Sequence, residues 1–219
     1  MLSEITDISL IFSAFCLLDR VFTNYTNLDG IYYLLHCIHN TIIVSLTANE
    51  VYYSLADFNF IQESPKNVLA LEFVFALHFY HIAIYWRKFR FDDWLHHILM
   101  IGIALPIGGY FDSKSLLGYS LFFTTGLPGG IDYFLLFLTR NGWFDRSFEK
   151  RINAWLNTWI RSPGCISNAT LSLVLISLNH TKLSFDWWLG MVCAILHWWN
   201  GQYFMRQVVE NNAIQQNFL

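Results

Sequence analysis

The sequence is poor in charge. Only 13% of its 219 residues are Asp, Glu, Lys or Arg, against about a quarter in ordinary soluble domains. The formal net charge is −3, which disfavours nucleic-acid binding because that function needs a basic surface. A soluble fold of this size could not bury the apolar surface implied by 55% hydrophobic residues and a mean hydropathy of +0.38. We therefore expect an integral membrane protein.

Cysteine is also scarce. The four cysteines are scattered through apolar stretches without CxxC spacing, at Cys16, Cys37, Cys165 and Cys193. We expect them to be small apolar core residues rather than disulfides or metal ligands. The N-terminus, Met1-Leu-Ser-Glu, lacks the positive region of a cleavable signal peptide. The first apolar stretch is therefore expected to stay in the protein.

Long apolar runs fill most of the chain. A helix needs about 20 mostly apolar residues to cross a bilayer. Candidate spans lie at roughly 5–22, 30–55, 67–86, 94–111, 115–139, 164–180 and 187–209. The first is short and ends on Asp19 and Arg20, so the expected count is six to seven. The connections are brief, and the sequence predicts one all-α domain over residues 1–219, a polytopic bundle of transmembrane helices.

Basic residues set the expected orientation, because cytosolic loops are enriched in Lys and Arg. Arg87, Lys88 and Arg90 lie between the third and fourth spans. A second basic group follows the fifth span and consists of Arg140, Arg146, Lys150, Arg151 and Arg161. The two loops are two spans apart and share a side, which we expect to be the cytosol.

The segment before the sixth span has a helical pattern of its own. Apolar residues recur at helical spacing, with polar residues between them, over Ile152, Asn153, Trp155, Leu156, Asn157, Trp159, Ile160 and Arg161. Pro163-Gly164 follows. Two interpretations stay open: a short helix lying in the cytosolic interface, or the first turns of the next membrane helix.

Histidines are concentrated in the apolar spans, where seven of the eight lie inside or at an edge. His36 and His39 are three residues apart, and so are His78 and His81, which puts each pair on one helix face. His96 and His97 are adjacent at the start of the fourth span, so only one can point fully inward. His197 shares a face with Asn200, and Glu72 and Asp132 complete the set of buried polar candidates.

Two chemistries could use these histidines, although any single one could be a hydrogen-bonded packing residue. Neutral imidazoles suit an iron or zinc centre, but the HxxHH-like clusters of membrane desaturases are not reproduced, because Asp93 leads the pair in Asp93-Trp-Leu-His-His. The second is proton transfer, in which a histidine takes a proton from an attacking hydroxyl or amine. We favour proton transfer and expect no bound metal.

The fifth span contains the run Thr124-Thr-Gly-Leu-Pro-Gly-Gly-Ile-Asp132. Glycine and proline at four of these positions predict a broken helix. Broken membrane helices line cavities, and Asp132 would lie in the first turn of the new helix. The alternative is a proline kink, with glycines that allow close helix packing.

Several motifs resemble the TLC superfamily, the membrane domain shared by ceramide synthases, translocation-associated membrane proteins and lipid regulators. Arg87-Lys88-Phe89, Asp92 or Asp93, and Leu95-His96-His97 resemble the opening of the ceramide synthase signature, and Gly118 fits loosely. Asp132-Tyr-Phe-Leu135 resembles its second acidic half, and Leu196 to Arg206 is similar to the last helix of the family. Catalytic members have His-Asp where this chain has Pro128-Gly129, and a Glu where it has Leu136.

The resemblance implies a barrel-like bundle around a central tunnel that admits an acyl chain, in the endoplasmic reticulum or a related membrane. It implies an N-acyltransferase of sphingolipid metabolism, with acyl-CoA as co-substrate, no other cofactor, and membrane lipids as partners. His97 would be the proton acceptor, His96 its orienting or second proton site, and Asp132 would orient or charge-balance an imidazole. We assign substrate-binding roles to His78, His81, His197, Asn200 and Glu72.

Two other functions stay open from the sequence. One is a non-enzymatic lipid sensor or regulator of membrane composition. The other is a proton or ion channel, or a small transporter, built on the fifth span and the histidines. A retinal-binding photoreceptor is disfavoured because no lysine lies in the middle of a span. The oligomeric state is left open.

Overall fold

The computed structural model describes residues 2–110, 114–179 and 184–216. Across these residues every regular element is a helix and no strand occurs. The first half contains α1 (Leu2–Tyr25), α2 (Ile31–Ala56), the short α3 (Phe58–Glu63) and α4 (Val68–Tyr85), which η1 (Trp86–Lys88) extends. The all-α prediction is therefore confirmed.

The second half consists mostly of long helices that each contain a π-helical turn. These are α5 (Phe91–Leu99), η2 (Met100–Ala104) and α6 (Leu105–Tyr110), then α7 (Leu116–Leu121), η3 (Phe122–Gly126) and α8 (Leu127–Arg140). The third is α9 (Arg146–Leu156), η4 (Asn157–Arg161) and α10 (Ser162–Asn179), and the straight α11 (Phe185–Gln216) follows. In each π turn a backbone N–H bonds the carbonyl five residues earlier, as Leu127 bonds Phe122.

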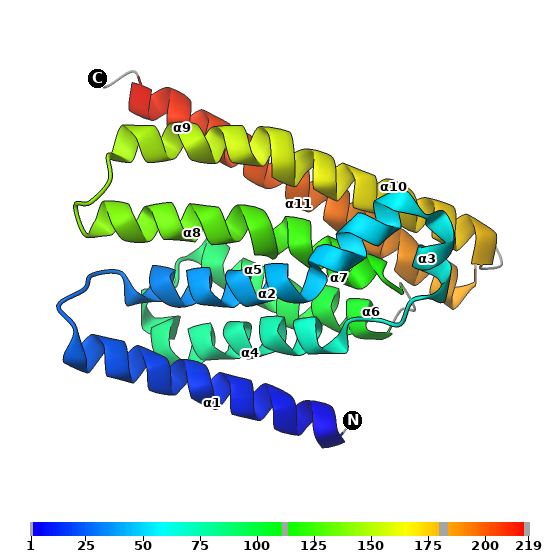
Figure 1. The fold of residues 1–219 in the computed structure, drawn as a ribbon, viewed down its shortest axis with the longest axis horizontal. Coiled ribbons are helices and arrows are strands. Elements are labelled where there is room, and N and C mark those ends of the chain that lie inside the picture. The colour runs from blue at the N-terminus through cyan, green and yellow to red at the C-terminus, as the bar shows by residue number, and fades with distance from the viewer. Residues whose placement is uncertain (1, 111–113, 180–183, 217–219) are drawn as a thin grey trace.

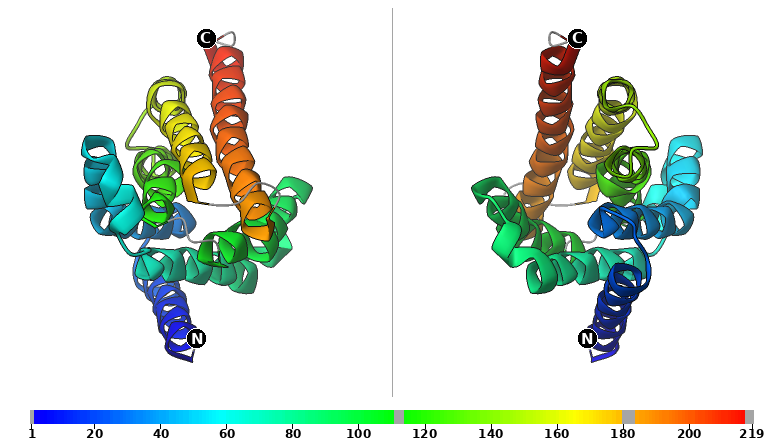
Figure 2. Two further views of the ribbon diagram at one scale, coloured as in Figure 1. Left: turned by 90° about the vertical axis from the view of Figure 1, so that its right-hand side faces the viewer. Right: turned by 90° about the vertical axis from the view of Figure 1, so that its left-hand side faces the viewer.

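The long helices lie roughly side by side along the length of the molecule (Figure 1). Helix α1 forms one edge and packs on α4, whereas α9, α10 and α11 lie at the opposite edge. Helices α2, α7 and α8 pack together between these edges. Figure 2 shows the same arrangement end-on, with the two termini at opposite edges.

Three of the described helices are long and apolar enough to cross a membrane: Ile31–Ala56, Val68–Lys88 and Leu116–Arg140. They correspond to the second, third and fifth predicted spans. Many of the large apolar side chains that these and other helices carry are exposed, among them Leu10, Leu55, Ile98 and Leu178. Such an apolar outer surface is expected where lipid, rather than water, surrounds the protein.

In the middle of the helix over Arg146–Asn179, tryptophans point outward and polar side chains point inward. Trp155 and Trp159 are exposed, whereas Asn153, Asn157 and Arg161 are buried. The chain continues without interruption from α9 through η4 into α10. The structure therefore favours the second interpretation of this segment, in which it forms the first turns of the next long helix.

The predicted break at Thr124–Asp132 is not present. The chain stays helical through this run, with the π turn η3 followed directly by α8 and with Pro128 in the first turn of α8. A proline has no N–H to donate and its ring crowds the preceding turn. A local change of helical pitch accommodates both effects without a gap in the helix.

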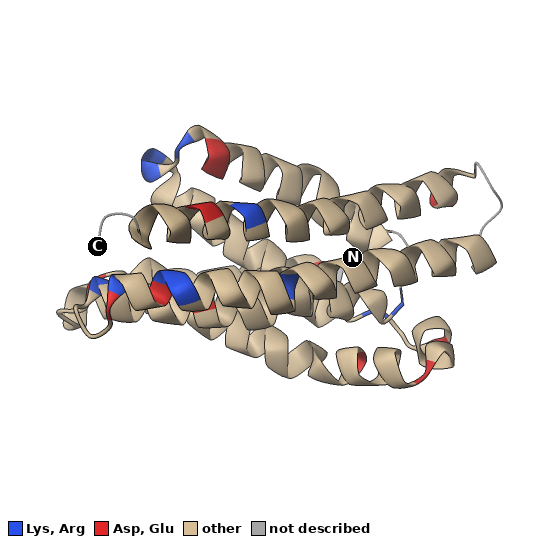
Figure 3. Ribbon diagram, turned by 90° about the horizontal axis from the view of Figure 1, so that it is seen from above, with Lys and Arg blue, Asp and Glu red and all other residues tan. Residues whose placement is uncertain are grey.

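Lys and Arg are concentrated toward the end of the bundle that carries the C-terminus (Figure 3). This end contains the C-terminal ends of α4 and α8 and the N-terminal ends of α2, α5 and α9. We call it the basic end. Both predicted basic loops therefore lie on the same side of the bundle.

Candidate functional site

Five histidines from three helices come together near the basic end. His36 comes from α2, His78 and His81 from α4, and His96 and His97 from α5. Helices α2 and α4 run antiparallel in Figure 1, so the start of α2 lies beside the end of α4. The i, i+3 spacing of His78 and His81 puts both on the face toward α2 and α5. We call these five residues the histidine cluster.

The imidazole rings of the histidine cluster are in contact. The rings of His36 and His81 stack with their centroids 4.2 Å apart. The rings of His81 and His97 are 5.4 Å apart and those of His78 and His97 are 5.3 Å apart. The Nε2 atoms of His78 and His96 approach to 3.4 Å. The rings form a continuous chain across the three helices.

The adjacent residues His96 and His97 differ in exposure. His97 is buried, with 4% of its surface exposed, whereas His96 is exposed. His36, His78 and His81 are buried. His96 therefore gives the buried imidazoles a direct contact with the surface of the protein.

Backbone carbonyls fix two of the buried imidazoles. His36 Nδ1 donates to the Tyr32 carbonyl at 2.7 Å, and His78 Nδ1 donates to the Val74 carbonyl at 2.8 Å. A carbonyl oxygen can only accept, so Nδ1 carries the proton in both neutral rings and Nε2 keeps its lone pair. A neutral His96 must then donate its Nε2 proton toward His78.

Two buried ring nitrogens of the cluster are left unpaired. Within the described part of the chain, His81 Nε2 and His97 Nδ1 have no hydrogen-bond partner. A buried polar atom without a partner is costly and usually marks a place for a ligand or water. These two nitrogens can receive or give a proton without first breaking a protein hydrogen bond.

Aromatic residues enclose the histidine cluster. The Tyr32 ring lies 4.1 Å from that of His36, and Tyr133 of α8 is also 4.1 Å from His36. The Phe89 ring stacks on His97 at 4.7 Å. Flat apolar faces exclude water from the imidazoles while leaving their edges free to exchange protons.

Asp132 precedes Tyr133 in the chain and belongs to a separate polar column. Its Oδ1 accepts a hydrogen bond from Asn153 Nδ2 at 2.6 Å, and Asn157 Nδ2 donates to Asn153 Oδ1 at 2.6 Å. Arg161 Nη1 donates to Asn157 Oδ1 at 2.9 Å. The expected imidazole partner of Asp132 is thus replaced by an asparagine, and Tyr133 makes the contact with the histidines.

The other predicted site residues lie outside the cluster. His197 Nδ1 accepts from Asn168 Nδ2 at 2.6 Å, so its Nε2–H donates to Ser120 Oγ, also at 2.6 Å. With both ring nitrogens bonded, His197 has the contacts of a packing residue. His39 Nδ1 donates to Asn40 Oδ1.

Glu72 and Asn200 are also separate from the cluster. Glu72 is buried on α4 and interacts electrostatically with Asp7 and Glu4 of α1. Asn200 lies on α11, and its Oδ1 has no hydrogen-bond partner among the described residues. The structure therefore brings together two of the five predicted substrate-binding residues, His78 and His81.

In residues 2–110, 114–179 and 184–216, no group of three or more His, Cys, Asp or Glu side chains is arranged to hold a metal ion. All four cysteines are free thiols.

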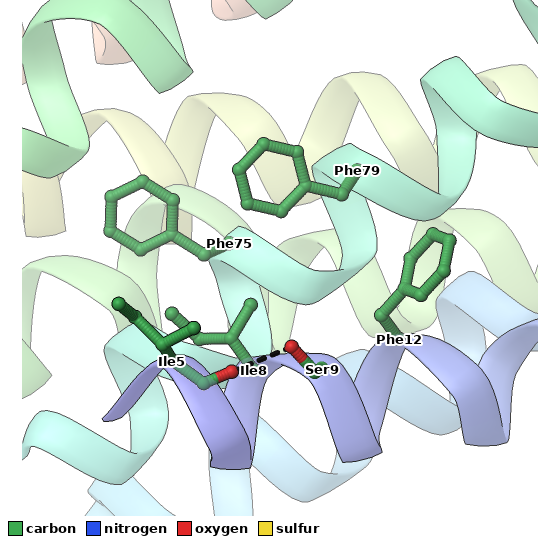
Figure 4. Close-up of a pocket in the computed structure, with 6 residues that line it drawn as sticks. All are labelled: Ile5, Ile8, Ser9, Phe12, Phe75 and Phe79. Atoms are coloured by element: carbon green, nitrogen blue, oxygen red, sulfur yellow. Dashed lines mark hydrogen bonds between the residues drawn. The ribbon is translucent and has the colours of Figure 1, made fainter. Parts of the chain in front are cut away.

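Two grooves between helices are lined by residues other than the histidines. One, of about 510 Å³, runs between α1 and α4 and is lined by Ile5, Ile8, Ser9, Phe12, Phe75 and Phe79. Figure 4 shows its aromatic rings arranged around an apolar space, with the Ser9 hydroxyl bonded to the Ile5 carbonyl. A smaller groove lies between α10 and α11. Both linings are mostly apolar, as suits an acyl chain.

The described residues thus define a helical protein with candidate membrane-spanning helices and a buried histidine cluster. Comparisons of the chain with family models, with curated proteins and with solved structures give no match.

Several polar residues that are buried in the structure have no functional role predicted from the sequence. They are Asn40, Ser120, Asn153, Asn157 and Asn168. The recurrence of Asn153, Asn157 and Arg161 at intervals of four could have revealed the polar column, because that spacing keeps all three on one helix face.

Proposed function

We propose that this protein is an integral membrane enzyme of lipid metabolism that transfers an acyl group to a long-chain amine. In this proposal all the long helices cross the bilayer, and acyl-CoA is the acyl donor. The histidine cluster supplies the general base. The chain would be a divergent member of the TLC superfamily, located in the endoplasmic reticulum or a related membrane, and acting on sphingoid or similar amines.

One observation carries the proposal: His97 Nδ1 and His81 Nε2 are buried and unpaired, in a cluster that also reaches the surface through His96. A general base must be within reach of the proton it abstracts and must hold a free lone pair. Intramembrane histidines are costly and are therefore functional candidates by default.

Acyl transfer from the thioester to the amine needs no further reactant. The amine nitrogen attacks the thioester carbonyl, so a C–N bond forms and the C–S bond breaks. His97 accepts the proton released from the nitrogen, and the same proton then neutralises the departing thiolate. His96, in contact with both His97 and His78, would exchange protons with the surface.

The test is an acyl-transfer assay on the purified protein in detergent, with a long-chain acyl-CoA and a sphingoid amine. We expect amide product by mass spectrometry, and His97→Ala should lower kcat by about 10²–10⁴-fold, the usual contribution of a general base. His197→Gln is the matched control, because His197 is also an intramembrane histidine but lies outside the cluster.

Two outcomes would contradict the enzyme proposal. One is the absence of amide from wild-type protein that is folded and loaded with both substrates. The other is equal activity of the wild type and His97→Ala. An acyl lipid that co-purifies without turnover would instead support a non-enzymatic lipid sensor.

A second candidate, a proton pathway, is favoured by the continuous ring contacts from the exposed His96 through His78 and His81 to His36. Tyr133 continues this chain toward Asp132. Proton flux into liposomes that falls in His78→Ala but not in His197→Gln would support it. Liposomes with wild-type protein but no flux above empty vesicles would exclude it.

A further inference from the structure

The apolar groove between α1 and α4 has acidic side chains at one end. Glu72 lies three residues before Phe75 and seven before Phe79, so it shares the face of α4 that lines the groove (Figure 4). On the α1 side, Glu4 and Asp7 act electrostatically on Glu72. The groove is therefore apolar along its length and acidic where α1 and α4 begin.

Glu72 is buried without a partner. It is 6% exposed, yet within the described part of the chain it accepts no hydrogen bond and forms no ion pair. Of the groups that act on it electrostatically, only the N-terminal amino group is positive. By contrast Asp19, which is also buried between α1 and α4, accepts hydrogen bonds from Tyr85 and Thr23. A buried carboxylate without donors is costly, so a cationic ligand would gain most at Glu72.

The lining of the groove suits a hydrocarbon tail. The groove holds about 510 Å³, within the range of about 300–1,000 Å³ that is usual for ligand pockets. Ser9 is its only polar lining residue, and its hydroxyl proton is used in the bond to the Ile5 carbonyl at 2.7 Å. The lining thus offers apolar contact, which stabilises a bound chain for each buried methylene, and no free donor for an anion.

The carboxylates determine the charge of the ligand. An ammonium donates charge-assisted hydrogen bonds to a carboxylate, and the attraction is strong where water is scarce. A phosphate group at the same place would meet like charges from Glu72, Glu4 and Asp7, which is unfavourable. The end of the groove therefore favours an amine and disfavours a phospholipid.

The position of Glu72 along α4 suits an amphiphile held in a leaflet. At about 1.5 Å of rise per residue, Glu72 lies roughly 6 Å from the start of α4 at Val68. The groove extends from there toward Phe79, in the direction of the basic end. A membrane amphiphile keeps its charged head near the interface and its tail toward the bilayer centre, and the groove has this polarity.

We infer that the groove between α1 and α4 binds a long-chain amine, with the ammonium on Glu72 and the hydrocarbon tail along Phe75 and Phe79. The ligand is of the same class as the acceptor in the proposed function, but the site is a different one. His81 lies nine residues further along α4, a rise of roughly 14 Å. Binding in the groove does not require the histidine cluster to be catalytic.

The test is the thermal stability of the full chain in neutral detergent at pH 7, followed by tryptophan fluorescence. The probes are oleylamine, oleyl alcohol as its uncharged match, oleate as its anionic match, and butylamine as the head group without a long tail. A ligand that binds only the folded state raises Tm with its concentration. We expect oleylamine to raise the wild-type Tm more than each of the other three probes.

One variant tests the ammonium site. Glu72→Gln keeps the shape of the side chain and removes its charge, so it should weaken oleylamine about tenfold or more, the usual effect of losing a hydrogen bond to a charged group. Glu63→Gln is the control for charge, because Glu63 of α3 is exposed and α3 lies at the same end of the bundle. It should keep the wild-type shift.

A second variant tests the tail site. Ser9→Leu places a larger side chain in the groove and should reduce the oleylamine shift. Ser13→Leu is the matched control, because Ser13 is also exposed on α1 and also donates to the carbonyl four residues earlier at 2.7 Å, but it does not line the groove. If one of the two test variants does not fold, the other decides.

Three results would overturn the inference. They are an oleyl alcohol shift equal to that of oleylamine, a full oleylamine shift in Glu72→Gln, and equal shifts in Ser9→Leu and Ser13→Leu. The measurement uses no acyl-CoA and no turnover. Its failure is therefore distinct from the absence of amide product in the acyl-transfer assay.

Discussion

At the scale of single residues, the main feature of this chain is that polar side chains are buried while large apolar ones are exposed. Asn40, Asn157 and Asn168 are almost fully buried, whereas Trp155 and Trp159 on the same bundle face outward. In hydrocarbon, polar groups must find their partners inside the protein, while apolar groups gain nothing by avoiding the exterior. The interior is therefore where function should be sought.

The polar column that contains Asp132 and Arg161 leads to a prediction about stability. Asp132→Asn keeps the shape of the side chain but removes the charge that accepts the hydrogen bond from Asn153 and acts on Arg161 at a distance. We expect a loss of about 1–3 kcal/mol in the free energy of unfolding, the usual cost of weakening a buried hydrogen bond to a charged group. The measurement is denaturant unfolding in detergent micelles.

The double variant Asp132→Asn with Arg161→Gln is the control for charge. It removes both charges, so its loss of stability should be smaller than the sum of the two single losses. Strictly additive losses would show that the two side chains do not interact through Asn153 and Asn157.

At the scale of elements, the packing of α10 on α11 depends on one glycine. A Cβ on Gly201 would lie 2.7 Å from Cys165 Cβ and 3.3 Å from the Ser162 Cα. The second of these atoms is backbone and cannot turn aside. Close approach of two long helices is therefore possible here only without a side chain.

We predict that Gly201→Ala destabilises the protein by about 1–3 kcal/mol, because overpacking forces the two helices apart. Gly102→Ala is the matched control. A Cβ there would meet no atom within 4 Å, so this variant should be neutral or slightly stabilising. Equal unfolding midpoints for the two variants would refute the packing argument.

The π turns are the second feature at the scale of elements. They lie at Met100–Ala104, Phe122–Gly126 and Asn157–Arg161, and each one joins two α-helices into one long helix. A π turn shifts the faces of the following helix, and such turns are frequent at functional sites. Here η4 itself carries Asn157 and Arg161, and η3 carries Thr125.

At the scale of the whole molecule, the two ends of the bundle differ in charge. The basic end contains the loops around Arg87 and Arg146, whereas α3 lies at the other end. Basic loops are retained in the cytosol. The basic end is therefore predicted to face the cytosol, and α3 the opposite compartment.

Single cysteines in a cysteine-free background test this orientation, with a membrane-impermeant maleimide as the reagent. Arg146→Cys should be labelled only from the cytosolic side and Asn59→Cys only from the other, since both positions are exposed. Both should react after detergent permeabilisation, which is the control. Labelling of the two positions from one side would refute the topology.

Helix positions could be predicted from the sequence alone. The predicted spans 30–55, 67–86 and 115–139 match Ile31–Ala56, Val68–Tyr85 and the helix over Leu116–Arg140 to within about two residues. A helix satisfies its backbone hydrogen bonds locally, so a long apolar run is sufficient to specify one. The predicted break at Pro128 was wrong because the π turn η3 accommodates the proline without interrupting the helix.

Which polar groups meet was decided only by the tertiary structure. The sequence places seven histidines in or beside apolar runs without showing which of them meet. Packing brought His36 to His81 and His78 to His96, and it placed His197 between Ser120 and Asn168. It also brought Asn40 and Arg161, which are far apart in the chain, close to Gly129. Helix periodicity fixes the face on which a residue lies, whereas contact between faces depends on the order and rotation of the helices, which arises from packing over the whole bundle.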